Sequence, residues 1–138
     1  MLEEAKRELQ KQTGITDEDF AKHISFPHNV KMLEKSQALG RYQIIAEAVQ
    51  SKYCSAGVKA GTKLVFDLKP AMLISRKSDC PLCARAIYPI CEAVDKVMER
   101  ILNGLDPEQP AIQADCRDPG LEKGGLGHVV FKVYARKM

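Results

Sequence analysis

The chain has 138 residues, the size of one ordinary domain, and 45% of them are hydrophobic, which is enough to form a core. The net charge is only +3, with no run of basic residues and no aromatic platform beside basic side chains, so we expect no nucleic-acid partner. No stretch approaches the roughly 20 apolar residues of a membrane-spanning helix. Residues 1–8 lack the positive-then-apolar order of a signal peptide, and we therefore expect a cytoplasmic protein without a membrane partner.

The first forty residues predict helices. Apolar spacing favours a helix over residues 1–12 that ends at Gly14. The hydroxyl group of Thr16 can cap a second helix, whose acidic first turn suits the positive end of the helix dipole. We expect residues 26–29 to interrupt the helices and residues 30–39 to form a short third helix.

The rest of the chain predicts strands around one long helix. Helical spacing of apolar residues indicates this helix over residues 80–103, with Ser78 or Asp79 as its cap. Pro81 fits the first turn, whereas Pro89 predicts a kink or a break inside the helix. Four segments have the apolar and β-branched content typical of strands, at residues 42–49, 63–67, 111–116 and 129–134.

The element order, helices followed by β-β-α-β-β, predicts an α+β fold. We expect a small antiparallel or mixed sheet with one long helix packed on it. Residues 1–40 are predicted to be an N-terminal helical extension, and residues 41–138 an α+β domain that contains the cysteines. The amphipathic N-terminal helices are the surface where we expect a homo-oligomer or a protein partner to bind.

Five cysteines are many for a chain of this length, and an odd number leaves at least one thiol outside any disulfide scheme. In a reducing compartment such thiols are metal ligands, redox groups or small packing residues. Cys80 and Cys83 stand out because they have the Cys-x-x-Cys spacing of metal sites and lie at the predicted start of the long helix. Cys91 falls on the apolar stripe of that helix, where we expect it to pack in the core.

Several short motifs follow one another in a fixed order through the last two-thirds of the chain. They are Cys54 with Gly57 and Gly61, Cys80 followed by Tyr88-Pro89, Cys116-Arg117-Asp118-Pro119, and Val129-Val130-Phe131-Lys132-Val133. In this order they resemble a family of small, functionally uncharacterised bacterial and archaeal proteins, over residues 42–137. The resemblance implies the strand and helix order given above and a set of three cysteines, but no mechanism, because that family has no established activity.

Adding Cys83 to the three cysteines of the resemblance gives a candidate metal site of Cys54, Cys80, Cys83 and Cys116. Four thiolates can close a tetrahedral site, and they suit zinc and iron–sulfur chemistry equally, so both remain open. A zinc ribbon has two Cys-x-x-Cys pairs, whereas this chain has one.

Two other functions are open, and the sequence does not decide whether the chain is an enzyme. One is a dithiol redox protein with Cys80 as nucleophile and Cys83 as resolving thiol, since a helix N-terminus favours the thiolate form. The other is a non-catalytic interaction module, in which the cysteines are structural and residues 1–40 pair with another chain. His128 opens the last predicted strand, where it could reach the cysteines, but we expect an exposed side chain.

Overall fold

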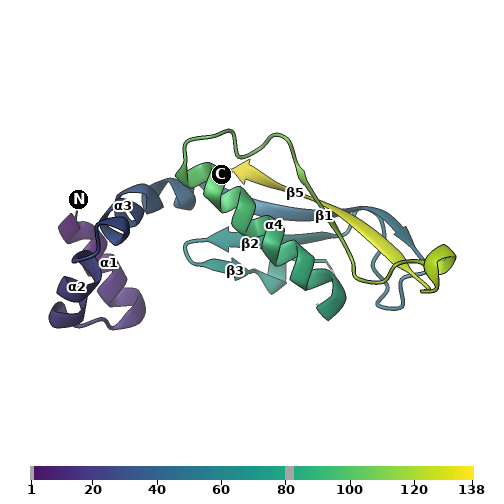
Figure 1. Cartoon of the computed structure of the whole chain (residues 1–138), viewed down its shortest axis with the longest axis horizontal. Coiled ribbons are helices and arrows are strands. Elements are labelled where there is room, and N and C mark those ends of the chain that lie inside the picture. The colour runs from purple at the N-terminus through teal and green to yellow at the C-terminus, as the bar shows by residue number, and fades with distance from the viewer. Residues whose placement is uncertain (1, 80–82) are drawn as a thin grey trace.

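The computed structural model describes residues 2–79 and 83–138. Helices at the N-terminal end lead into an antiparallel sheet, and a long helix packs on one face of that sheet (Figure 1). The helical elements are α1 (Leu2–Thr13), α2 (Asp17–Ile24), α3 (Pro27–Lys35), α4 (Ala84–Leu102) and the short 3-10 helices η1 (Ser36–Arg41), η2 (Ser75–Lys77) and η3 (Leu121–Lys123). The strands are β1 (Tyr42–Lys52), β2 (Lys63–Leu68), β3 (Ala71–Leu73), β4 (Ile112–Asp115) and β5 (His128–Lys137). The predicted α+β architecture is confirmed.

The ends of the N-terminal helices follow from local chemistry. The hydroxyl oxygen of Thr16 accepts the backbone N–H of Asp19 at 3.1 Å, which makes Thr16 the N-cap of α2 as predicted. Gly14 has a φ of +72°, which glycine adopts without strain, and it follows the end of α1. The predicted interruption is present but shorter than expected, because it covers Ser25 and Phe26 and α3 already begins at Pro27. A proline in the first turn loses no helical hydrogen bond.

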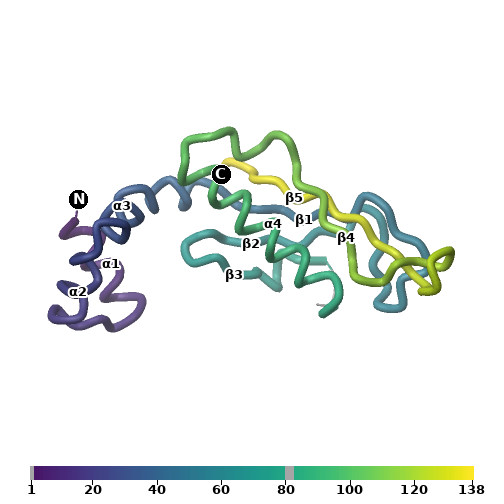
Figure 2. The backbone as a smooth tube through the Cα atoms, viewed as in Figure 1, coloured from purple at the N-terminus to yellow at the C-terminus, as the bar shows by residue number. Residues whose placement is uncertain are grey.

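The N-terminal helices contact the rest of the molecule at defined points. Lys69, in the turn between β2 and β3, forms an ion pair with Glu8 of α1 at an N–O distance of 2.9 Å. Leu39 of η1 is buried in the core that α4 and the sheet form together. Figure 2 shows α1 to α3 at one end of the molecule, with the turn that connects β4 and β5 at the other end.

The sheet has the strand order β3-β2-β1-β5-β4, and all of its neighbouring strands are antiparallel. The long strands β1 and β5 lie in the middle, so that Ile44 of β1 pairs with Phe66 of β2 on one side and Ala135 of β5 on the other. These residues belong to the buried core under α4. Strand β3 was not predicted, because it has three residues and none of them is fully buried.

Helix α4 covers the sheet with an apolar face and continues through Pro89, so the predicted break does not occur. Its buried residues are Ala86, Pro89, Ile90, Ala93, Val94, Val97 and Ile101. The helix ends at Leu102, and Gly104 follows with a φ of +69°, as the glycine position predicts. Over residues 2–79 and 83–138, no helix combines the length and the hydropathy needed to cross a membrane.

The start of α4 differs from the prediction. The helix begins at Ala84 with Cys83 as its N-cap, four residues later than expected. Ser78 and Asp79 do not cap it, because both are hydrogen-bonded to β2 instead. The Ser78 hydroxyl accepts the N–H of Val65 at 3.0 Å, and the Asp79 carboxylate accepts the N–H of Lys63 at 3.1 Å. The predicted cysteine ligand Cys80 and the predicted first-turn residue Pro81 lie outside the described residues.

The packing of α4 on the sheet predicts a large loss of stability when Ile90 is truncated. Its side chain is 0% exposed at the centre of the interface, and an Ile→Ala change at such a site costs about 2–5 kcal/mol. We therefore expect Ile90→Ala to lower the free energy of unfolding by that amount in urea denaturation. Val49→Ala is the matched control, because Val49 is 42% exposed on β1 and its truncation should cost less than about 0.5 kcal/mol. Equal costs for the two variants would contradict this packing.

Candidate functional site

A cavity of about 470 Å³ lies beside the N-terminal end of α4. Its walls come from the loop after β1, from the first residues of α4, from the chain after β4 and from the start of β5. Apolar side chains line much of it, including Val58, Val129 and Phe131, and the charged residues Arg85 and Asp118 also contribute.

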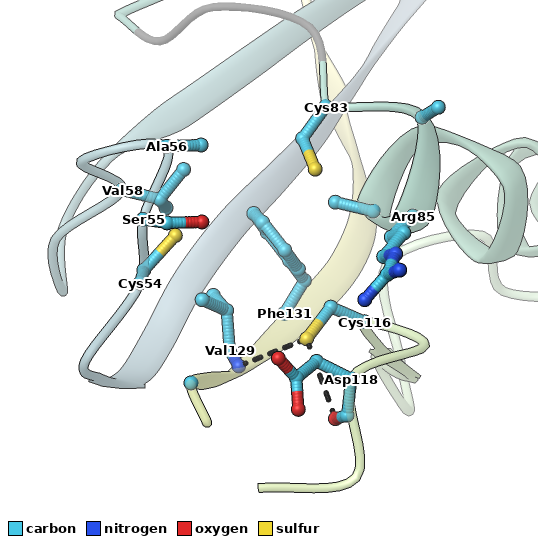
Figure 3. Close-up of a pocket in the computed structure, with 13 residues that line it drawn as sticks. Cys54, Ser55, Ala56, Val58, Cys83, Arg85, Cys116, Asp118, Val129 and Phe131 are labelled. Carbon is cyan, nitrogen blue, oxygen red and sulfur yellow. Dashed lines mark hydrogen bonds between the residues drawn. The ribbon is translucent and has the colours of Figure 1, made fainter. Parts of the chain in front are cut away.

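Three cysteines bring their sulfur atoms to this cavity. Cys54 comes from the loop after β1, Cys83 is the N-cap of α4, and Cys116 directly follows β4. Figure 3 shows the three sulfur atoms facing the same hollow from different sides. All three side chains are half-buried and form no disulfide. The structure thus brings together three of the four predicted ligands, and the fourth, Cys80, lies outside the described residues.

Strand pairing orients the Cys116 thiol. The N–H of Cys116 donates to the carbonyl oxygen of Val129 at 3.0 Å, and the N–H of Val129 donates to the Cys116 sulfur at 3.3 Å. The sulfur therefore accepts a backbone N–H from β5. It also lies 3.8 Å from the carbonyl oxygen of Asp118, to which the thiol donates, so two backbone groups fix its position.

The segment after Cys116 is fixed by the Asp118 carboxylate. One of its oxygens accepts the N–H of Gly120 at 3.0 Å and the N–H of Leu126 at 3.1 Å, an arrangement typical of an Asp-Pro-Gly turn. The Gly120 hydrogen bond is the main reason that the pKa of Asp118 lies below its usual value, with further help from Leu126. A Cβ atom on Gly125 would overlap with this carboxylate oxygen, so the turn requires glycine there.

His128 lies beside Cys116 and is less exposed than expected. It is half-buried, and its Nδ1 lies 2.5 Å from the carbonyl oxygen of Asp118 and 3.8 Å from the sulfur of Cys116. Because a carbonyl oxygen only accepts, Nδ1 carries a proton. The Nε2 atom lies 3.2 Å from the Asp115 carboxylate. The Asp118 carbonyl, followed by Asp115, raises the pKa of His128 above its ordinary value. The antiparallel return from β4 to β5 is the signal that could have located His128 beside the end of β4.

Close backbone approach brings the Cys54 loop to the start of β5. A Cβ atom on Gly127 would overlap with the carbonyl group of Tyr53. Gly127 is buried, and it lines the cavity together with Cys54. Figure 2 shows the loop after β1 and the turn between β4 and β5 meeting at the same end of the sheet. The absence of a side chain at position 127 therefore allows this contact.

Cys91 is not a core residue, contrary to the prediction. Its side chain is exposed on α4. The buried face of the helix is centred on Ile90, Val94 and Val97, and Cys91 lies about 100° around the helix from Ile90. Partial burial, followed by the nearby charge of Asp95, raises the pKa of the Cys91 thiol. Cys91 does not belong to the cavity and is a useful reference thiol.

The three cysteine sulfur atoms lie at separate places on the cavity wall and do not converge on a single position. Among the described residues, no group of three Cys, His, Asp or Glu side chains is close enough to hold a single metal ion. What the cavity presents is a set of soft sulfur donors at separate positions on its wall.

Comparison of the chain with known protein families, with curated proteins and with solved structures finds no match. The family resemblance described above therefore stays a prediction.

The contact between Gly127 and Tyr53 predicts that a methyl group at position 127 displaces the Cys54 loop. We expect Gly127→Ala to lower the thermal midpoint and to increase the alkylation rate of Cys54, because the side chain requires the two backbone segments to separate. The measurement is differential scanning fluorimetry combined with mass spectrometry of iodoacetamide-treated protein.

Gly40→Ala is the matched control for this variant. The nearest atom to a Cβ at position 40 is a flexible Lys69 side-chain carbon at 4.0 Å, so the substitution meets no backbone. If Gly127→Ala behaved like Gly40→Ala in both measurements, the close approach would be contradicted.

Proposed function

We propose that Cys54, Cys83 and Cys116 bind a metal centre in the cavity, through their thiolates. The observation that supports this most strongly is the common orientation of three sulfur atoms from three separate segments toward one half-buried space. The same three side chains also pack against the hydrophobic core, and metal binding is the function that their common orientation supports. Thiolate donors select soft or borderline metals, which favours zinc or iron–sulfur chemistry.

The surroundings of Cys116 support metal binding. The Val129 N–H directed at the Cys116 sulfur is the kind of contact that supports sulfur ligands and tunes their metal. The apolar wall formed by Val58, Val129 and Phe131 lowers the local polarity and limits access of water to such a centre.

An iron–sulfur cluster suits this cavity better than one zinc ion. A cluster contains several metal and sulfide atoms and is held by thiolates that surround it, whereas one zinc ion requires its ligands to converge at about 2.3 Å from a single point. The three thiols lie around a cavity of about 470 Å³. The proposal rests on Cys54, Cys83 and Cys116 alone. A fourth ligand, Cys80, is a prediction from the sequence.

The test is elemental analysis of the full-length protein purified without oxygen, together with its visible absorption spectrum and its acid-labile sulfide content. We expect iron and sulfide in comparable amounts, with Cys54→Ser, Cys83→Ser and Cys116→Ser each losing most of both. Cys91→Ser is the matched control and should retain the metal, because Cys91 is exposed and outside the cavity. Zinc without sulfide would identify a zinc site in the same cavity.

Two results would contradict the proposal. One is a protein that contains no metal and takes up neither zinc nor iron with sulfide during reconstitution. The other is metal that persists in all three cysteine variants of the cavity. A Cys80→Ser variant, measured in the same way, decides whether Cys80 is a fourth ligand.

Dithiol redox chemistry is the second candidate, because Cys83 is the N-cap residue of α4. A helix N-terminus is a position where reactive cysteines of redox proteins are found. Metal-free protein in which Cys83 and Cys80 form a disulfide that dithiothreitol reduces would support this function. The interaction-module alternative stays a sequence prediction, and its readout is the oligomeric state in solution.

A further inference from the structure

Pro89 leaves one carbonyl group of α4 without its helical partner. In an α-helix the N–H of each residue donates to the carbonyl oxygen four residues earlier, so the residue at position 89 would serve Arg85. Proline has no N–H to donate, and its ring crowds that same carbonyl. Pro89 is nevertheless inside α4 and buried against the sheet.

The free carbonyl is used by the segment that carries Cys116. The backbone N–H of Arg117 donates to the carbonyl oxygen of Arg85 at 3.1 Å. The Arg117 guanidinium also lies over the ring of Tyr88, with its carbon 5.1 Å from the ring centre. Two contacts therefore hold Arg117. Tyr88 contacts its side chain, and the Arg85 carbonyl that Pro89 leaves free accepts its backbone N–H.

This hydrogen bond joins two of the three cysteine-bearing segments. Arg85 lies two residues after Cys83, and Arg117 directly follows Cys116. Both Cys83 and Cys116 line the cavity, on opposite sides of the junction between α4 and β4. A change in this single contact would alter the relative position of the two thiols without altering either cysteine.

We infer that Pro89 is a positioning residue for the cysteine cavity: by leaving the Arg85 carbonyl free, it binds the Cys116 segment to the first turn of α4. The role of Pro89 is thus to redirect a hydrogen bond from the helix to the site. The effect on the two thiols follows from the structure, and only its consequence for metal binding rests on the proposed function.

The test is Pro89→Ala in the full chain, which supplies the missing N–H. We expect the Arg117 amide to exchange roughly tenfold faster with solvent deuterium, the change that corresponds to losing one hydrogen bond of ordinary strength. We also expect Cys116 to be alkylated faster relative to Cys54 in the metal-free protein. The thermal midpoint of Pro89→Ala should not fall along with these changes. The reason is that an interior proline disfavours the helix that it occupies, so its replacement stabilises the helix.

Two further variants keep the test decisive. Pro89→Val supplies the N–H while retaining most of the buried apolar volume, so it replaces Pro89→Ala if the smaller side chain unfolds the protein. Cys91→Ala changes an exposed residue of the same helix and should leave the Arg117 amide unchanged. Unchanged exchange at Arg117, or faster exchange without any change at Cys116, overturns the inference.

Reconstitution with iron and sulfide provides the link to function. We expect Pro89→Ala and Pro89→Val to retain less iron and sulfide than the parent protein after anaerobic reconstitution, as followed by visible absorption. A parent protein that takes up neither would count against the proposed metal site only, because the amide exchange and the alkylation rates still decide the role of Pro89. Equal uptake in parent and variants, with uptake present, would contradict the positioning role.

Discussion

The hydrogen bond from the Arg117 N–H to the Arg85 carbonyl is the constraint on which the arrangement of the cavity depends. It connects the first turn of α4 to the chain that leaves β4, and these are the segments that carry Cys83 and Cys116. Core packing also fixes the position of this contact. The apolar face of α4 packs on the central strands, which sets the distance between the N-terminal end of the helix and the sheet. The junction is therefore determined by core packing as well as by the bond itself.

The third cysteine is positioned by backbone proximity. The loop of Cys54 lies against Gly127 at the start of β5, and β5 in turn supplies the N–H that meets the Cys116 sulfur. Asp118 fixes the turn between these points by accepting two backbone N–H groups. Backbone groups and residues without bulky side chains thus make most of the contacts that shape the cavity. This explains why the chain needs glycine at positions 125 and 127, where any side chain would collide.

Much of the fold could be predicted because its signals are local. The cap at Thr16, the glycine after α1, the main strands and the body of α4 all follow from residues within a few positions of one another. The start of α4 could not be located, because Ser78 and Asp79 are equally good partners for a neighbouring strand and bond to β2. Strand β3 was missed because its three residues form an edge with no buried pattern.

The site was predicted less completely, because its members meet only in three dimensions. Cysteine spacing and the family resemblance predicted a set of Cys54, Cys80, Cys83 and Cys116, yet neither gave the cavity that Cys54, Cys83 and Cys116 share. For His128 the exposed alternative was preferred, since its partners, Asp115 and Asp118, belong to the previous strand and the turn after it. Cys91 was misassigned because its spacing from Ile87 and Val94 fits an apolar stripe, whereas the buried face of α4 is centred about 100° away, on Ile90.

The most direct measurement for the central claim is mass-spectrometric footprinting of all five thiols with an alkylating agent, before and after anaerobic reconstitution with iron and sulfide. If the three thiols hold one metal centre, reconstitution will protect Cys54, Cys83 and Cys116 together, while the exposed Cys91 stays reactive. Protection that is confined to Cys80 and Cys83, or equal alkylation of every thiol in both conditions, would contradict the account.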